Sequence, residues 1–317
     1  MDTDKIDRRN RITRQPRGNI ALRPMPRDLV WFEKLHHHGP LPTSYLHAFT
    51  SHLARSGDSA RAIKRMCKLF HEGNLLSKPG KQFDTMDARH NQLIYDLNEH
   101  SIQILREEGG YSDRAPACSG PWKHRAMVSS ITASIELATY GKNIRYIPQH
   151  EILDQLGTTL RIPVTIRNDR LARDEQHDLI PDAMFGLEYD EAGRKSYIFY
   201  LVEADRGTEP LKVKNLARKS YLRSIQQYRK LIGGKHYKAH FGLNAGLLVL
   251  NVTTSEERMK NLIELVAESS DSGGNTYMLF QTAPMFGTYF KPPKPIPDLL
   301  TGPWHRAGHA PFYLNLP

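Results

Sequence analysis

The sequence has little cysteine and no long hydrophobic run. Its 317 residues include only two cysteines, and so few thiols exclude the disulfide frameworks of small secreted proteins. No apolar stretch approaches the roughly 20 residues that are needed to cross a bilayer. The polar start, residues 1–5, lacks the apolar middle of a secretory signal. We therefore expect a cytoplasmic protein with reduced thiols and no membrane partner.

Acidic residues are also in the minority. The chain has 34 Asp and Glu against 44 Lys and Arg, which gives a net charge of +10 and a pI near 9.5. A basic balance favours a polyanionic partner, most often nucleic acid. Residues 1–27 contain eight Arg or Lys against three Asp and show no helical or strand periodicity. We expect residues 1–26 to form a disordered basic arm; the alternative is a solvated tail without a role.

Length and composition predict two domains behind this arm. A chain of 317 residues can form two hydrophobic cores, and 25% charged with 39% hydrophobic residues is ordinary for a soluble globular protein. Gly, Ser, Pro and Asp gather in residues 111–121 and predict a linker there. The expected domains are therefore residues 27–110 and residues 122–317.

The first domain has the pattern helix, helix, helix, strand, strand, helix. Four residues can cap helices, namely Asp28, Thr43, Ser59 and Asn98. Between the third and fourth helices, residues 74–78 and 92–97 are strand-like runs. A polar loop with basic residues joins the two strands, as in the wing of a winged helix. The pattern therefore predicts a winged-helix domain, a variant of the helix-turn-helix.

The third helix of this domain carries two opposite faces. Its apolar residues recur at helical spacing and predict a buried face formed by Ile63, Met66, Cys67 and Phe70. Its basic residues lie about half a turn away. In helix-turn-helix proteins the corresponding helix enters the major groove, with phosphate contacts from nearby Lys and Arg. We therefore predict that double-stranded DNA is bound by Arg61, Lys64, Arg65, Lys68, Lys78 and Lys81, against the alternative of a solvated face.

Three consecutive histidines, residues 36–38, have the look of a metal-binding tract. They end a predicted helix just before Gly39-Pro40. A position at a helix end favours a capping or surface role for them over metal binding.

The second domain predicts a mixed sheet covered by helices. Its elements are a helix over 122–140, a strand near 160–166, a hairpin over 180–209, a basic helix over 213–232, a strand over 246–252, a helix after the capping box at 254–257 and a strand over 276–281. A strand, a helix and a strand of this length form a parallel crossover. The whole chain is therefore predicted to be an α/β protein.

The hairpin brings carboxylates together. If its turn centres on Ala192 and Gly193, antiparallel pairing joins residues whose numbers sum to about 385, which places Asp182 beside Glu203. Asp205 lies two residues on and shares the face of Glu203. Three like charges repel one another, so a cation must lie among them. Oxygen ligands suit Mg²⁺ or Mn²⁺; the alternative is a charge network with Arg206, Arg218 or Lys219.

The order of elements with this acidic cluster resembles the restriction-endonuclease-like nuclease core. In that core an Asp after Pro and an (Asp/Glu)-x-Lys tripeptide hold a divalent metal and the attacking water. Pro181-Asp182 and Glu203-Ala204-Asp205 stand at these places. The resemblance implies Asp182, Glu203 and Asp205 as candidate catalytic and metal-binding residues. The third position departs from the pattern: a lysine would help to position or deprotonate the water, whereas Asp205 could only strengthen metal binding or accept a proton.

Residues 27–317 as a whole resemble the replication-relaxation family of plasmids, phages and integrated elements. The most specific match is the block from Glu203 to Pro210; further matches are Pro181-Asp182, the helix with Tyr221 and Tyr228, residues 248–258 and Trp304. The resemblance implies a winged helix joined to a nuclease-like α/β domain.

Three functions are consistent with this sequence. The leading hypothesis is a DNA-binding protein that acts in replication, relaxation or maintenance of a mobile element, with replication or transfer proteins as further partners. The first alternative is a Mg²⁺- or Mn²⁺-dependent DNA nuclease or nickase that uses the carboxylate cluster. The second is a winged-helix transcriptional regulator whose second domain only binds partners.

Overall fold

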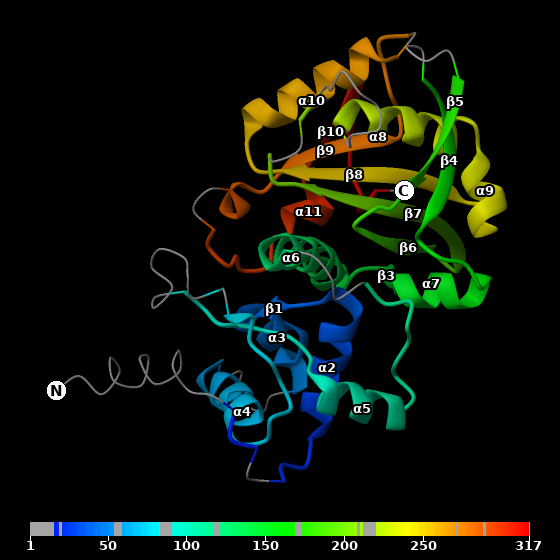
Figure 1. Cartoon of the computed structure of the whole chain (residues 1–317). Helices are drawn as coiled ribbons and strands as arrows, with labels where there is room; N and C mark the ends of the chain where they lie inside the picture. Colours follow the sequence, from blue (N-terminus) through cyan, green and yellow to red (C-terminus); the bar gives the residue numbers. More distant parts are fainter. Residues whose placement is uncertain are drawn as a thin grey trace. The chain divides into compact units, whose positions relative to one another are not determined.

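The computed structural model divides the chain into two compact units, and each is described by itself (Figure 1). The first unit is Met1–Leu137 with Thr288–Ile296, and the second is Ala138–Gly287 with Pro297–Pro317. The structure describes residues 16–18, 21–53, 59–80, 82, 91–116, 121–168, 173–207, 210–211, 220–270, 272–287 and 290–316. Most of the predicted basic arm therefore lies outside the described residues. Within these ranges, no helix is long and apolar enough to span a membrane.

The first unit is built mainly of helices, in the order that the sequence predicts. They are α2 (Pro26–His38), α3 (Thr43–Phe49), the 3₁₀ turn η1 (Ser51–Leu53), α4 (Ser59–His71), α5 (Glu99–Glu107) and α6 (Trp122–Thr139), the last as far as Leu137. Asn98 caps α5 as predicted, because its side chain accepts a 3.1 Å hydrogen bond from the backbone N–H of Ser101.

The strands of the first unit are shorter than predicted. β1 (Leu41–Pro42) pairs antiparallel with β2 (Ile94–Tyr95), and Ser77 and Asp96 form an isolated bridge. The side chain of Gln82 is one reason, because it accepts from the Ile94 N–H at 2.9 Å and donates to the Ile94 carbonyl at 3.1 Å. Those backbone groups are thus satisfied by a side chain instead of a neighbouring strand. Residues 83–90, which were predicted to join the two strands, lie outside the described residues.

Helix α6 shares the core of the first unit. Trp31, Phe32 and Phe49 are fully buried there, and Ala133 of α6 belongs to the same cluster. The compact units consequently divide after Leu137, whereas the sequence predicted a linker at 111–121 and a second domain starting at 122.

Two of the three histidines in the tract, His36 and His38, are buried, which corrects the predicted capping or surface role for them. His38 is 2% exposed; its Nδ1 lies 2.9 Å from Thr132 Oγ1 and its Nε2 lies 2.7 Å from Glu136 Oε2. His36 is buried too, and its Nε2 accepts from the Ser112 N–H at 2.9 Å. The last turn of α2 faces α6 and the chain after α5, so these imidazoles contact protein groups instead of water.

The second unit is centred on a seven-stranded sheet in the order β11-β10-β9-β8-β7-β6-β3. β7, β8 and β9 are parallel, and the other neighbouring pairs are antiparallel. The mixed sheet confirms the predicted α/β class. The strands are β3 (Ile144–Pro148), β6 (Ala183–Glu191), β7 (Arg194–Asp205), β8 (Gly246–Thr253), β9 (Met278–Thr282), β10 (Trp304–Arg306) and β11 (His309–Phe312).

Helices α8 and α10 cover one face of this sheet. Leu201, Val249 and Met278 point from neighbouring strands into a core that includes Tyr228 of α8 and Leu262 of α10. Figure 1 shows α10 along this face. The helical elements of the second unit are α7 (Gln149–Leu156), α8 (Tyr221–Tyr228), the π-helix η3 (Arg229–Gly233), α9 (His236–Phe241), α10 (Glu256–Glu268), the 3₁₀ turn η4 (Pro284–Phe286) and α11 (Asp298–Thr301).

One predicted strand belongs to a different sheet. β4 (Ile162–Asn168) covers the predicted strand 160–166, but it pairs with β5 (Arg173–Leu179) in a separate two-stranded sheet. The place beside β6 is taken by β3, a strand that was not predicted from the sequence. β3 has only five residues and lies at the sheet edge, so it lacks the long alternating pattern that marks a strand.

The central hairpin has the predicted register. Ala183 pairs with Val202 and Glu191 with Arg194, so the paired numbers sum to 385 at both ends. Ala192 and Gly193 form the turn with φ of 54° and 89°, the left-handed values that a two-residue hairpin turn requires.

Candidate functional site

Asp182 lies against β7, next to Glu203 along the strand pair. Its backbone N–H donates to the Val202 carbonyl at 2.9 Å, which continues the hairpin ladder beyond β6. Its Oδ2 accepts from the Ala204 N–H at 2.8 Å. The backbone of β7 therefore holds this carboxylate at the end of the hairpin.

Glu203 is held from α8. Its Oε1 accepts a hydrogen bond from the Tyr228 hydroxyl, and its neighbour on β8 is Asn251. The Tyr221 hydroxyl, seven residues before Tyr228 and so on the same side of the helix, donates to Asn251 Oδ1 at 2.6 Å. Two tyrosines of one helix thus bond two adjacent polar side chains of the sheet.

Tyr228 is a hydrogen-bond donor in this arrangement. Burial raises its pKa well above the ordinary value of 10, and the charge of Glu203 raises the pKa further. The side chain is fully buried. A phenol that stays protonated and has no access to solvent cannot serve as a nucleophile at neutral pH.

Asp205 is paired with an arginine of α10. Its Oδ2 lies 2.7 Å from Arg258 Nε, with only 9% and 16% of the two side chains exposed. The same oxygen accepts from Thr253 Oγ1 at 3.4 Å, and Oδ1 accepts from the Gly207 N–H at 2.9 Å. Asp205 therefore already has a cation beside it.

Arg258 was not among the predicted partners, which were Arg206, Arg218 and Lys219. Arg218 and Lys219 lie outside the described residues. The predicted capping box could have pointed to Arg258. It starts α10 at the carboxyl end of β8, where Ser255 is the cap, and because β7 and β8 are parallel, this end lies beside the carboxyl end of β7 with Asp205.

Asp205 is ion-paired with Arg258, while Asp182 and Glu203 accept hydrogen bonds from the Ala204 N–H and the Tyr228 hydroxyl. A guanidinium beside Asp205 repels a second cation. In the described parts of the chain, no three His, Cys, Asp or Glu side chains are placed to hold a metal ion together. Binding of Mg²⁺ or Mn²⁺ by Asp182, Glu203 and Asp205 stays a prediction.

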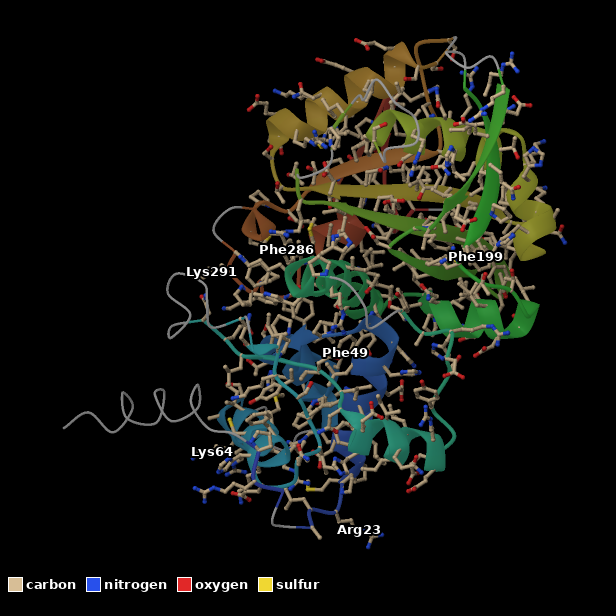
Figure 2. All side chains as sticks on the ribbon, viewed as in Figure 1. Arg23, Phe49, Lys64, Phe199, Phe286 and Lys291 are labelled. Atoms are coloured by element: carbon tan, nitrogen blue, oxygen red, sulfur yellow. The ribbon has the colours of Figure 1, made fainter. Side chains whose placement is uncertain are left out.

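The exposed face of α4 keeps three of its four predicted basic residues. Arg61, Lys64 and Lys68 are exposed, and Figure 2 shows Lys64 on the outer side of α4. Arg65 is half-buried instead: its Nε and one terminal nitrogen bond Asp28 Oδ2 at 3.0 and 2.6 Å. It therefore neutralises a fully buried carboxylate and holds α4 to α2.

The core face of α4 explains this correction. Its buried residues are Ala62, Met66, Leu69, Phe70 and His71, while the predicted Ile63 and Cys67 are only half-buried. Positions 62, 65, 66 and 69 follow the i, i+3, i+4, i+7 rule. Arg65 thus falls on the buried stripe.

The two predicted wing lysines also differ from expectation. Lys78 is half-buried with its ammonium 4.0 Å from the centre of the Phe70 ring. Burial lowers the pKa of Lys78 to about 8. It is therefore stacked on the core and is no flexible tip; Lys81 lies outside the described residues.

Comparisons with known proteins agree with the resemblance seen in the sequence. A family model described as replication-relaxation matches residues 32–247. A solved structure titled "Structure of SdaI restriction endonuclease" is similar at 14% identity over 82% of this chain and 86% of that chain, with a TM-score of 0.21, which is too low to carry an argument. No curated protein matches the sequence. The family model covers more than half of the residues, so the chain belongs to the replication-relaxation family.

Proposed function

We propose that the protein binds double-stranded DNA through its first unit and acts in replication, relaxation or maintenance of a plasmid, phage or integrated element. The observation that carries the proposal is the outer face of α4. Arg61, Lys64 and Lys68 are exposed there while the opposite face is buried in the core of the first unit. Membership of the replication-relaxation family and the net charge of +10 support it.

The order of elements supports a winged-helix mode of binding. α2, α3 and α4 are followed by the strand β2, which pairs with β1 and continues into the Ser77–Asp96 bridge. In helix-turn-helix proteins the helix in the position of α4 enters the major groove. Lys64 and Lys68 stand one turn apart on that helix, and within the described ranges neither forms an ion pair. Both ammonium groups are therefore available to phosphates.

The test is DNA binding by the variant Lys64→Ala/Lys68→Ala. Each phosphate contact contributes about 0.9 to the salt exponent of binding, so loss of two contacts lowers affinity about thirtyfold near 0.15 M salt. A matched control removes two exposed lysines of the second unit, Lys142 and Lys260. Equal affinities of the two variants for the selected duplex would refute the role of α4.

The two alternative functions, a nuclease and a transcriptional regulator, can each be tested separately. A nuclease or nickase is favoured by one observation, the placement of Asp182 beside Glu203 at the end of the hairpin. Its test is Mg²⁺- or Mn²⁺-dependent nicking of a supercoiled plasmid that is lost in Asp182→Asn. A transcriptional regulator would use the same face of α4, and the genomic position of the DNA that the protein retains separates it from a replication factor.

A further inference from the structure

Three adjacent hollows surround the π-helix η3 in the second unit. The first, of about 610 Å³, lies between β4 and α9 and is lined by Arg167, Lys230 and His236. The second, of about 580 Å³, shares these three residues and adds Arg229. The third, of about 500 Å³, shares Arg229 with the second and continues towards the segment after α10. Because neighbouring hollows share residues, they form a series, which we call the η3 trough.

The trough is basic. Arg167, Arg229 and Lys230 are exposed along it, and Asp174 is the single carboxylate among the lining residues of the three hollows. Arg167 Nη1 lies 3.7 Å from Asp174 Oδ1, with more than half of both side chains exposed, so water screens this pair strongly. Lys230 forms no ion pair with any described residue. The lining thus presents a surplus of positive charge to solvent.

The backbone of the trough allows close approach. Gly233 and Gly234 follow the π-helix and line the second hollow. A Cβ at Gly234 would lie 2.5 Å from the Lys230 carbonyl oxygen, so the turn that ends the π-helix requires glycine there. A Cβ at Gly233 would meet only Arg229 Cγ, at 4.0 Å, which leaves this stretch of main chain open. Single π-helical turns occur often at functional sites.

A half-buried glutamine with a buried oxygen atom adds an independent sign of a ligand. Gln226, on the last turn of α8, lines the second hollow, and its Oε1 is buried without a hydrogen-bond partner. A buried polar atom without a partner costs free energy. The amide can present either its oxygen or its nitrogen to a polar group in the trough.

We propose that the η3 trough binds the sugar–phosphate backbone of double-stranded DNA, as a second contact besides α4. The surplus of Arg and Lys matches phosphate, and a series of hollows matches an extended chain of phosphates better than one small anion. The choice of DNA as the ligand rests on the proposed function. Because these side chains contact phosphates, this contact adds affinity without sequence preference.

Lysine footprinting tests both contacts in one sample. The full-length protein is acetylated with and without a selected DNA duplex, and the labelling of each lysine is read by mass spectrometry. Lys230 reports on the trough, Lys64 and Lys68 report on α4, and exposed Lys238 of α9, which lines none of the three hollows, is the control. We expect protection of Lys230, Lys64 and Lys68 and unchanged labelling of Lys238.

A charge variant completes the test. Lys230→Ala should weaken duplex binding about fivefold near 0.15 M salt and lower the salt exponent by about 0.9, equally for all sequences; Lys238→Ala should change neither. An unprotected Lys230 with unchanged affinity overturns the trough whatever α4 does. Protection of Lys230 without protection of Lys64 and Lys68 overturns the role of α4 and leaves the trough standing, and protection of neither overturns both.

Discussion

Replacing Arg258 by Met separates the two interpretations of the carboxylate cluster. Met keeps much of the aliphatic stem and removes the guanidinium, so that Thr253 and the Gly207 N–H remain as the partners of Asp205 among the described residues. The pair is short, at 2.7 Å, and mostly shielded from water. Hydrogen bonds to charged groups contribute about 1.5–3 kcal/mol, and leaving one charge of a buried pair alone costs about 3–5 kcal/mol. Because both side chains keep some exposure, we expect a loss of about 2–3 kcal/mol.

A double-mutant cycle isolates the pair itself. Asp205→Asn removes the charge from the other side, and the double variant should lose less than the sum of the single variants, with a coupling of about 1–3 kcal/mol. Hydrogen exchange of the amides of β7 and β8 measures the stability of the second unit without mixing it with that of the first. A matched control, Lys260→Met on the exposed side of α10, should change little.

The metal interpretation predicts the opposite outcome. If the three carboxylates repel one another until a cation binds, removal of Arg258 should strengthen binding of Mn²⁺, and Mn²⁺ should then protect β7 and β8 by mass action. Two results together would refute the charge network. The β7 and β8 amides would be as protected from hydrogen exchange in metal-free Arg258→Met as in the wild type, and Mn²⁺ would greatly raise their protection in the wild-type protein.

Three further predictions concern metal, pH and the basic arm. Glu203→Gln should destabilise the second unit by about 1–2 kcal/mol, because Tyr228 loses a charged acceptor. Mn²⁺ should leave the melting temperature unchanged in both the wild type and this variant. A rise in the melting temperature of the wild type with Mn²⁺, abolished in Glu203→Gln, would contradict this prediction. Burial lowers the pKa of His38 below 6.5, while His38 and Lys34 outweigh burial and lower the pKa of Glu136 to about 2. Both groups bind more protons in the unfolded state, so the first unit should lose stability as pH falls below about 6.5 and again below about 4.5. If the unfolding free energy of His38→Asn had the same dependence on pH between 7 and 5 as that of the wild type, the role of His38 would be refuted. Deletion of residues 1–24 should lower affinity for all duplexes about equally, since a cationic arm contacts phosphates, and a selective loss at one site would instead show that the arm reads bases.

Local patterns predicted the fold where local interactions decide it. The register of the β6–β7 hairpin followed from the turn at Ala192 and Gly193 and was confirmed. The cap at Asn98 was also confirmed, because a cap depends on residues three positions apart. The helix after the predicted capping box at 254–257 is also present, with Ser255 as its cap. The family resemblance could also be seen in the sequence, because it rests on motifs of neighbouring residues such as the block from Glu203 to Pro210.

Features that depend on distant contacts were missed. β3 is short and becomes a strand by pairing with β6, which no local pattern of five residues reveals. The Arg258–Asp205 pair joins residues that only the parallel pairing of β7 with β8 brings together. The exposure of Arg65 was predicted wrongly for a different reason. Arg65 lies on the same face of α4 as the buried residues Ala62, Met66 and Leu69, so helical periodicity alone would have placed it beside the core.

The salt dependence of duplex binding shows whether Lys64 and Lys68 of α4 contact DNA phosphates. The exponent, measured for the wild-type protein and for Lys64→Ala/Lys68→Ala on the same selected duplex, counts the phosphates that the two lysines neutralise. We expect the exponent to fall by about 1.8 in this variant while unfolding of the first unit is unchanged, since both side chains are exposed. An identical exponent for the two proteins would contradict the claim that α4 contacts DNA.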